Sequence, residues 1–111
     1  MRKVARVVRS SDVVKVMLYQ QPEGVYVFEY DAIEDAPAIS DYLATDMIQA
    51  LEIAFNEFGI EVSDWYEVDE PLENCLPDWI APVRPLGFGT SRVDWSRYEM
   101  LSEGRWTVLP M

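Results

Sequence analysis

Carboxylates crowd residues 64–84, and they are the side chains best suited to chemistry in this sequence. The segment DWYEVDEPLENCLPDWIAPVR combines them with two Trp, a Tyr and three Pro, and its single basic residue stands at the end. Glu67, Asp69, Glu70 and Glu73 supply hard oxygen ligands, but their spacing lacks the glycine turn of an EF-hand loop. A solvated acidic loop is the favoured interpretation. We predict no metal site and no cofactor, and leave weak Ca²⁺ or Mg²⁺ association open.

Nucleophilic catalysis is the next chemistry to consider, because Cys75 lies in the same segment. The chain contains no His, so neither a Cys-His nor a Ser-His-Asp arrangement exists, and the usual zinc ligand sets are absent as well. The nearby acids raise the pKa of a thiol by repelling the thiolate. We therefore expect a buried, inert Cys75 and no catalytic residues, with a small carboxylate-based enzyme as the least favoured alternative.

The charge distribution says more than the net charge of −11. Residues 16–83 hold sixteen Asp and Glu and no Lys or Arg, whereas residues 1–15 carry five basic side chains and one acid. Nucleic acids and anionic membranes bind clustered cations, so we expect neither as a partner. A basic protein or a cation is the natural complement of this charge, although acidity also simply keeps proteins dissolved.

Aromatic side chains among these acids suggest a protein-binding surface. The candidate contact residues are Trp65, Tyr66, Glu67, Asp69, Glu70, Glu73 and Asp78. If the aromatic residues pack inward, the segment is instead a covering loop that is stiffened by its prolines. We expect Trp79, which is flanked by apolar residues, to take the packing role.

The elements that must position these residues begin with three strands. The segments RKVARVVRS and DVVKVMLYQ flank Ser10-Ser11 and predict a hairpin, and VYVFEYD follows the turn QPEG as a third strand. In that third strand Tyr26, Phe28 and Tyr30 share one face, and Val25, Val27 and Glu29 share the other. DYLAT is a short extended piece, and IEVSDWYEV predicts another strand. DEPLENCLPDW predicts a long ordered loop, and RYEML and RWTVL predict a hairpin with Gly104 at its turn.

One helix is expected between Asp46 and Gly59. Asp46 followed by Gln49 matches a capping box, and Gly59 suits a left-handed C-terminal cap. An apolar stripe between them should lie on the sheet; it consists of Met47, Ala50, Leu51, Ala54 and Phe58. The order of elements predicts an α+β fold, in which one main helix packs on one face of an antiparallel sheet made of an N-terminal meander and a C-terminal hairpin.

Size and composition favour one domain spanning residues 1–111. The basic start is not followed by an apolar run of signal-peptide length, and a lone Cys suits a reducing compartment. We therefore expect a cytoplasmic protein.

A resemblance to known proteins rests on three segments of the chain: EGVYVFEYD, the run from ALEIAFNEFG to DWIAPVR, and GRWTVL. Together they resemble a group of small acidic bacterial proteins with no assigned activity, and residues 78–84 (DWIAPVR) are the most specific part. The resemblance implies a single-domain cytoplasmic bacterial protein, and it implies no catalytic residues.

The sequence thus predicts a non-enzymatic binding protein, of the kind that acts as an immunity or inhibitor-like partner of a basic protein. A structural or regulatory module is the alternative. Self-association is left open.

Overall fold

The computed structural model describes residues 1–8 and 12–110, and the chain divides into two compact units, Met1–Glu70 and Pro71–Met111. The first holds a five-stranded antiparallel sheet and one helix, and the second holds a three-stranded antiparallel sheet. The predicted α+β class, with one helix packed on a sheet, is confirmed. That residues 1–111 form a single domain stays a prediction, and the two units are described separately below.

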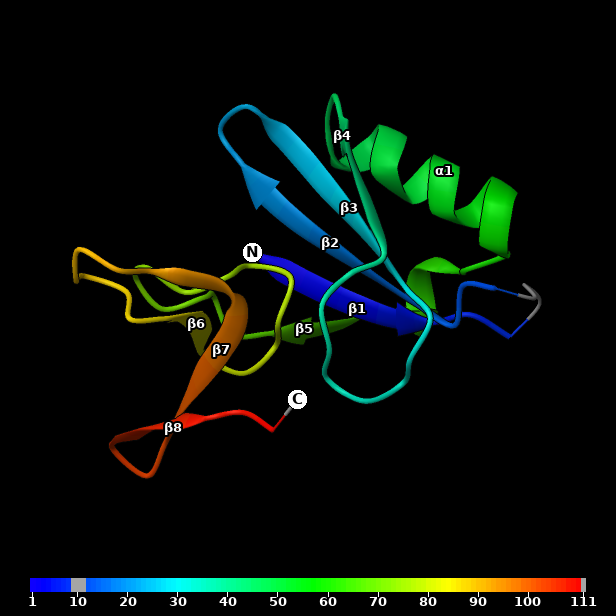
Figure 1. Ribbon diagram of the computed structural model, residues 1–111. Helices are drawn as coiled ribbons and strands as arrows, with labels where there is room; N and C mark the ends of the chain where they lie inside the picture. The colour runs from blue at the N-terminus through cyan, green and yellow to red at the C-terminus, as the bar shows by residue number, and fades with distance from the viewer. Residues whose placement is uncertain (9–11, 111) are drawn as a thin grey trace. The chain divides into compact units, whose positions relative to one another are not determined.

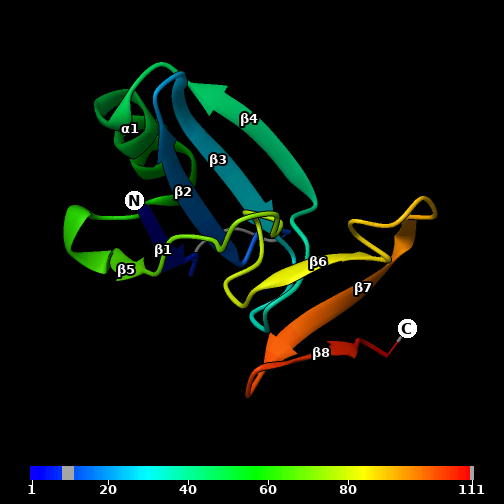
Figure 2. The ribbon, with the colours of Figure 1, turned by 90° about the vertical axis from the view of Figure 1, so that its left-hand side faces the viewer.

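The first unit is built on the predicted meander. Its strands, listed along the chain, are β1 (Arg2–Arg6), β2 (Lys15–Gln21), β3 (Gly24–Tyr30), β4 (Ser40–Ala44) and β5 (Tyr66–Val68). They lie in the spatial order β4-β3-β2-β1-β5, so β4 and β5 are the edges (Figures 1 and 2). The turn predicted at Ser10-Ser11 lies outside the described residues.

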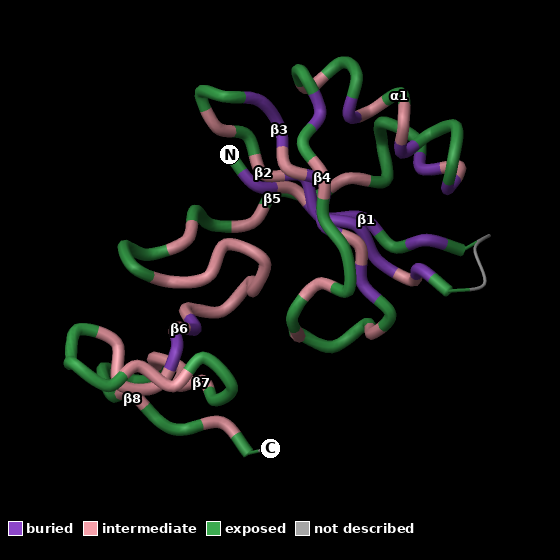
Figure 3. Tube along the Cα trace, turned by 45° about the horizontal axis from the view of Figure 1, so that its top comes forward, coloured by how far each residue is buried: buried purple, intermediate pink, exposed green. Residues whose placement is uncertain are grey.

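The two faces of this sheet differ as the alternation in β3 predicts. Val25 and Val27 belong to the apolar core between the sheet and the helix, together with Val16 and Leu18 of β2. Tyr26 and Phe28 are on the opposite face, where their rings stack with centroids 6.3 Å apart. Burial is concentrated in the central strands and on one side of the helix (Figure 3).

Helix α1 (Met47–Phe58) begins and ends where its capping residues predict. The Asp46 side chain accepts a hydrogen bond from the Gln49 backbone N–H at 2.8 Å, and the Gln49 side chain in turn accepts one from Thr45 N–H at 2.6 Å. Gly59 takes a left-handed φ of 69°, and its N–H caps carbonyls of the last turn. Ala50, Ala54 and Phe58 of the predicted stripe are buried, whereas Met47 and Leu51 are partly buried against the core.

The strand predicted over IEVSDWYEV is wrong in its first half. A 3₁₀ turn, η1 (Val62–Asp64), precedes the short β5 strand. Asp64 explains the difference, because its carboxylate accepts a hydrogen bond from Glu61 N–H at 2.8 Å and so closes a local turn instead of extending the chain.

The second unit contains the predicted loop and the predicted C-terminal hairpin. Its strands are β6 (Val83–Leu86), β7 (Asp94–Ser102) and β8 (Arg105–Val108), in the order β6-β7-β8. Glu103 and Gly104 both have positive φ, 52° and 77°, as a tight two-residue hairpin turn requires. The structure thus places the hairpin in a sheet of its own with β6, separate from the sheet of the meander.

Candidate functional site

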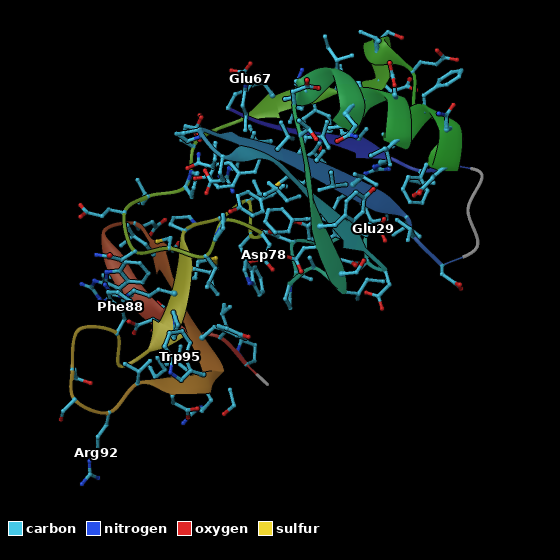
Figure 4. All side chains as sticks on the ribbon, turned by 90° about the horizontal axis from the view of Figure 1, so that it is seen from above. Glu29, Glu67, Asp78, Phe88, Arg92 and Trp95 are labelled. Carbon is cyan, nitrogen blue, oxygen red and sulfur yellow. The ribbon has the colours of Figure 1, made fainter. Side chains whose placement is uncertain are left out.

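The seven candidate contact residues are distributed over both units. The first unit holds five of them: Trp65, Tyr66, Glu67, Asp69 and Glu70. The second unit holds Glu73 and Asp78. Figure 4 labels Glu67 on the edge strand β5 and Asp78 on the loop that precedes β6. The segment therefore divides at Glu70, and each part is considered with its own unit.

Trp65 combines a packing role with a surface role. It packs against the apolar core of the first unit, and it also forms part of the wall of a surface hollow described below. Its buried indole N–H has no hydrogen-bond partner among the described residues. Tyr66, the next residue, is half exposed. The inward-packing interpretation thus holds for Trp65 and does not hold for Tyr66.

Three of the predicted acidic residues lie beside positively charged groups of residues 1–3. Glu67 is opposite Lys3 in the β1–β5 ladder. The backbone carbonyl of Asp69 accepts a hydrogen bond from Arg2 Nε at 2.6 Å, and the Glu70 carboxylate forms an ion pair with the amino group of Met1. This end of β5 is therefore partly neutralised within the protein, which makes it a weaker contact surface than the sequence suggests.

Two basic side chains of the N-terminal region are removed from the surface. Arg2 and Lys15 are only 1% and 2% exposed. Lys15 Nζ donates to the carbonyls of Ile33 and Glu34, each at 3.2 Å, and lies 4.6 Å from the centre of the Tyr30 ring. Burial lowers the pKa of both groups, and nearby acids oppose that shift. These cations therefore make their polar contacts within the unit and present little surface to a partner.

An apolar hollow lies between α1 and the segment that follows it. Its volume is about 220 Å³, and its lining consists of Leu51, Glu52, Phe55, Asn56, Ile60, Glu61, Val62 and Trp65. Phe55 is 49% exposed and Val62 is 77% exposed. None of the described residues that line this hollow is basic, while two are carboxylates. We call it the α1 groove.

Sequence reasoning missed every residue of the α1 groove except Trp65 as part of a site. A signal was present, since Ile48 and Phe55 are seven positions apart and so form a second apolar strip beside the buried stripe. Both side chains are exposed. Leu51 belongs to both strips, which is why it is only partly buried.

The first unit has a second hollow with a volume of about 300 Å³, and Phe58 and Gly59 at the end of α1 form part of its wall. Its lining is more polar and includes Arg6, Asp64 and Tyr66. With one cation and one acid in its wall, it lacks the uniform charge of the α1 groove.

In the second unit, Trp79 has the predicted packing role. Its ring lies 6.0 Å from that of Tyr98 at an angle of 54°. Glu73 is exposed and Asp78 is partly buried. On the β6–β8 sheet, Arg84 Nε forms a 2.7 Å ion pair with Glu99, and its guanidinium lies 3.6 Å from the centre of the Trp106 ring.

Cys75 differs in part from the expectation. It is partly rather than fully buried, and burial is the main cause that raises the pKa of its thiol. Arg84 opposes that shift. The direction expected from the sequence is therefore correct, but the main cause is desolvation rather than repulsion by nearby acids.

Two further features, metal ligation and membrane crossing, concern the part of the chain that the structure describes. No group of three or more Cys, Asp or Glu side chains there is arranged to hold a metal ion. No helix there is both long and apolar enough to cross a membrane. No protein-family model matches the chain, and no curated protein or solved structure shows significant similarity to it. The resemblance to small acidic bacterial proteins stays a prediction.

Proposed function

We propose that this protein is a cytoplasmic, non-catalytic binding protein whose first unit captures a basic protein, in the manner of an inhibitor or immunity protein. The observation that carries the proposal is the α1 groove, where exposed apolar side chains lie beside Glu52 and Glu61 and none of the described lining residues is basic. Apolar anchors surrounded by charge of one sign are typical of protein recognition surfaces.

The distribution of charge along the chain supports the same proposal. Residues 16–83 contain no Lys or Arg, and Arg2 and Lys15, which precede them, are buried and make polar contacts inside the first unit. All charged side chains of α1 and of the segment that follows it are therefore acidic. A field of this sign accelerates the approach of a cationic partner and repels anionic ones.

Charge reversal at the groove tests the proposal. Three forms of the protein are immobilised: the wild type, the pair Glu52→Lys with Glu61→Lys, and a control pair of equal charge change outside the groove, Asp41→Lys with Glu103→Lys. Both control residues are exposed. Each form is exposed to lysate of the source organism at about 0.15 M salt, where distant charges are largely screened.

We expect the wild type and the control pair to retain the same basic protein and the groove pair to lose it. Equal retention by all three forms would show that the acidic groove does not recognise the partner. Retention of no basic protein by the wild type would count against the function itself.

A further inference from the structure

The size of the α1 groove limits what it can bind. Pockets for small-molecule ligands and cofactors are typically about 300–1,000 Å³ and largely enclosed, whereas this hollow measures about 220 Å³. It is large enough to receive one or two side chains of a partner. A side chain anchored in such a hollow is the usual centre of a protein interface.

The wall of the groove selects an apolar side chain. Five of its residues are apolar: Leu51, Phe55, Ile60, Val62 and Trp65. Among them, Phe55 and Val62 expose much of their surface to water in the described structure. Covering them with an aliphatic or aromatic side chain removes that surface from water, which favours binding.

The polar part of the wall selects the residues beside that anchor. Glu52 on α1 and Glu61 before η1 alternate in sequence with the apolar lining residues, and Asn56 is the third polar residue of the lining. A basic residue next to the anchor would meet a carboxylate, whereas an acidic one would meet charge of its own sign. The groove thus discriminates by charge as well as by polarity.

We infer that the α1 groove binds an apolar side chain, aliphatic or aromatic, that is flanked by Lys or Arg on the surface of a basic partner protein. This inference rests on the proposed function and names the chemistry of its partner. The apolar anchor supplies most of the affinity, and the flanking cations supply the selectivity and the rate of association.

The described residues include a segment of similar chemistry, which makes a second copy the competing occupant. Trp95 is 69% exposed on β7, with Arg92 and Arg97 close to it in sequence. Figure 4 shows Arg92 extending away from the loop that precedes β7. The experiment below therefore includes a measurement of self-association.

Synthetic peptides test the inference directly. The first peptide has a central Trp between two pairs of Arg, the second has Ala in place of Trp, and the third has Glu in place of the four Arg. Binding of each labelled peptide is measured by fluorescence anisotropy at about 0.15 M salt. We expect the Trp peptide to bind roughly tenfold or more tightly than the Ala peptide, from the apolar area that Trp buries, and the Glu peptide not to bind.

Two double variants locate the binding site. Phe55→Ala with Val62→Ser removes apolar surface from the groove without changing charge. The matched control, Ile39→Ser with Leu72→Ser, removes apolar surface elsewhere, since both residues are exposed and neither lines the groove. We expect the groove variant to bind the Trp and Ala peptides equally and the control to keep the preference for Trp.

The outcomes separate the inference from the proposed function. Equal, salt-sensitive binding of the Trp and Ala peptides to the wild type overturns the inference but leaves an electrostatic binding function standing. Binding of none of the peptides, together with no retained basic protein, overturns both. A concentration-dependent dimer in sedimentation velocity, abolished by Trp95→Ala and by the groove variant alike, overturns the foreign partner in favour of a second copy.

Discussion

Two phenylalanines of α1, three positions apart, provide a controlled test of which side of the helix is available. Phe58 is buried in the core of the first unit, whereas Phe55 is about half exposed in the wall of the α1 groove. Truncation of a buried Phe to Ala costs about 3–5 kcal/mol through lost burial and the cavity that remains. Phe55 buries about half as much surface and leaves no enclosed cavity, so we expect Phe55→Ala to cost about 1 kcal/mol.

The two variants are compared by urea unfolding followed by circular dichroism at 222 nm. Since α1 is the one α-helix of the described residues, this signal reports mainly on the first unit. Linear extrapolation gives the free energy of unfolding for each variant. We expect Phe58→Ala to lose at least about 2 kcal/mol more than Phe55→Ala. Equal losses, or the reverse order, would refute the assignment of the two sides of the helix and with it the exposed groove.

Three further predictions concern other positions. Burial raises the pKa of Tyr42 to about 12, and its hydroxyl has no hydrogen-bond partner among the described residues. The folded pKa thus exceeds the ordinary value of about 10. The contribution of Tyr42 to the free energy of unfolding is therefore complete below pH 10 and is lost as the pH rises towards 12. Tyr42→Phe should therefore be at least as stable as the wild type at pH 7 and less sensitive to alkali in thermal melts, and a lower stability at pH 7 would contradict this. Gly24 has a φ of 149°, and an added Cβ would collide with the Ala44 carbonyl. Gly24→Ala should therefore lower the free energy of unfolding by at least about 1 kcal/mol in the same urea assay. An unchanged free energy of unfolding would contradict this prediction. Cys75 should react with a thiol reagent at pH 7 more slowly in the native protein than in denaturant, because burial raises the pKa of its thiol. Equal rates would show that the fold neither shields this thiol nor raises its pKa.

The parts of the fold that sequence predicted well are those fixed by local signals. The two ends of α1 are defined by capping residues next to the helix in sequence, Asp46 and Gln49 at its start and Gly59 at its end. The alternation of side chains in β3 assigns the two faces of this strand without any knowledge of the partner strands. Likewise, Gly104 marks the C-terminal hairpin, because few other residues accept its φ.

Features that depend on tertiary contacts could not be predicted in the same way. Lysine is usually a surface residue, and the burial of Lys15 is explained by its contacts with the loop carbonyls of Ile33 and Glu34 and with the Tyr30 ring. Asp64 looked like part of a strand, but its carboxylate closes a local turn. The division of the strands into two sheets depends on long-range pairing, which no local pattern encodes.

The candidate site was predicted only in part for a related reason. Charge counts along the sequence cannot tell which acids already have a partner, so Glu70, which pairs with the amino group of Met1, was ranked with free carboxylates. The α1 groove is formed by residues of α1 and of the segment after it, and exposed apolar residues such as Phe55 carry meaning only when their neighbours are known.

The central claim is that the α1 groove of the first unit is a binding surface for an apolar anchor flanked by cations. Titration of the ¹⁵N-labelled protein with the Trp peptide, followed by two-dimensional NMR, tests it most directly, because backbone amides and the Trp65 indole N–H report binding at known positions. The account predicts saturable shifts at Phe55, Val62 and the Trp65 indole, which are lost in the Phe55→Ala, Val62→Ser variant. Shifts confined to the second unit, or no shifts at millimolar peptide, would contradict it.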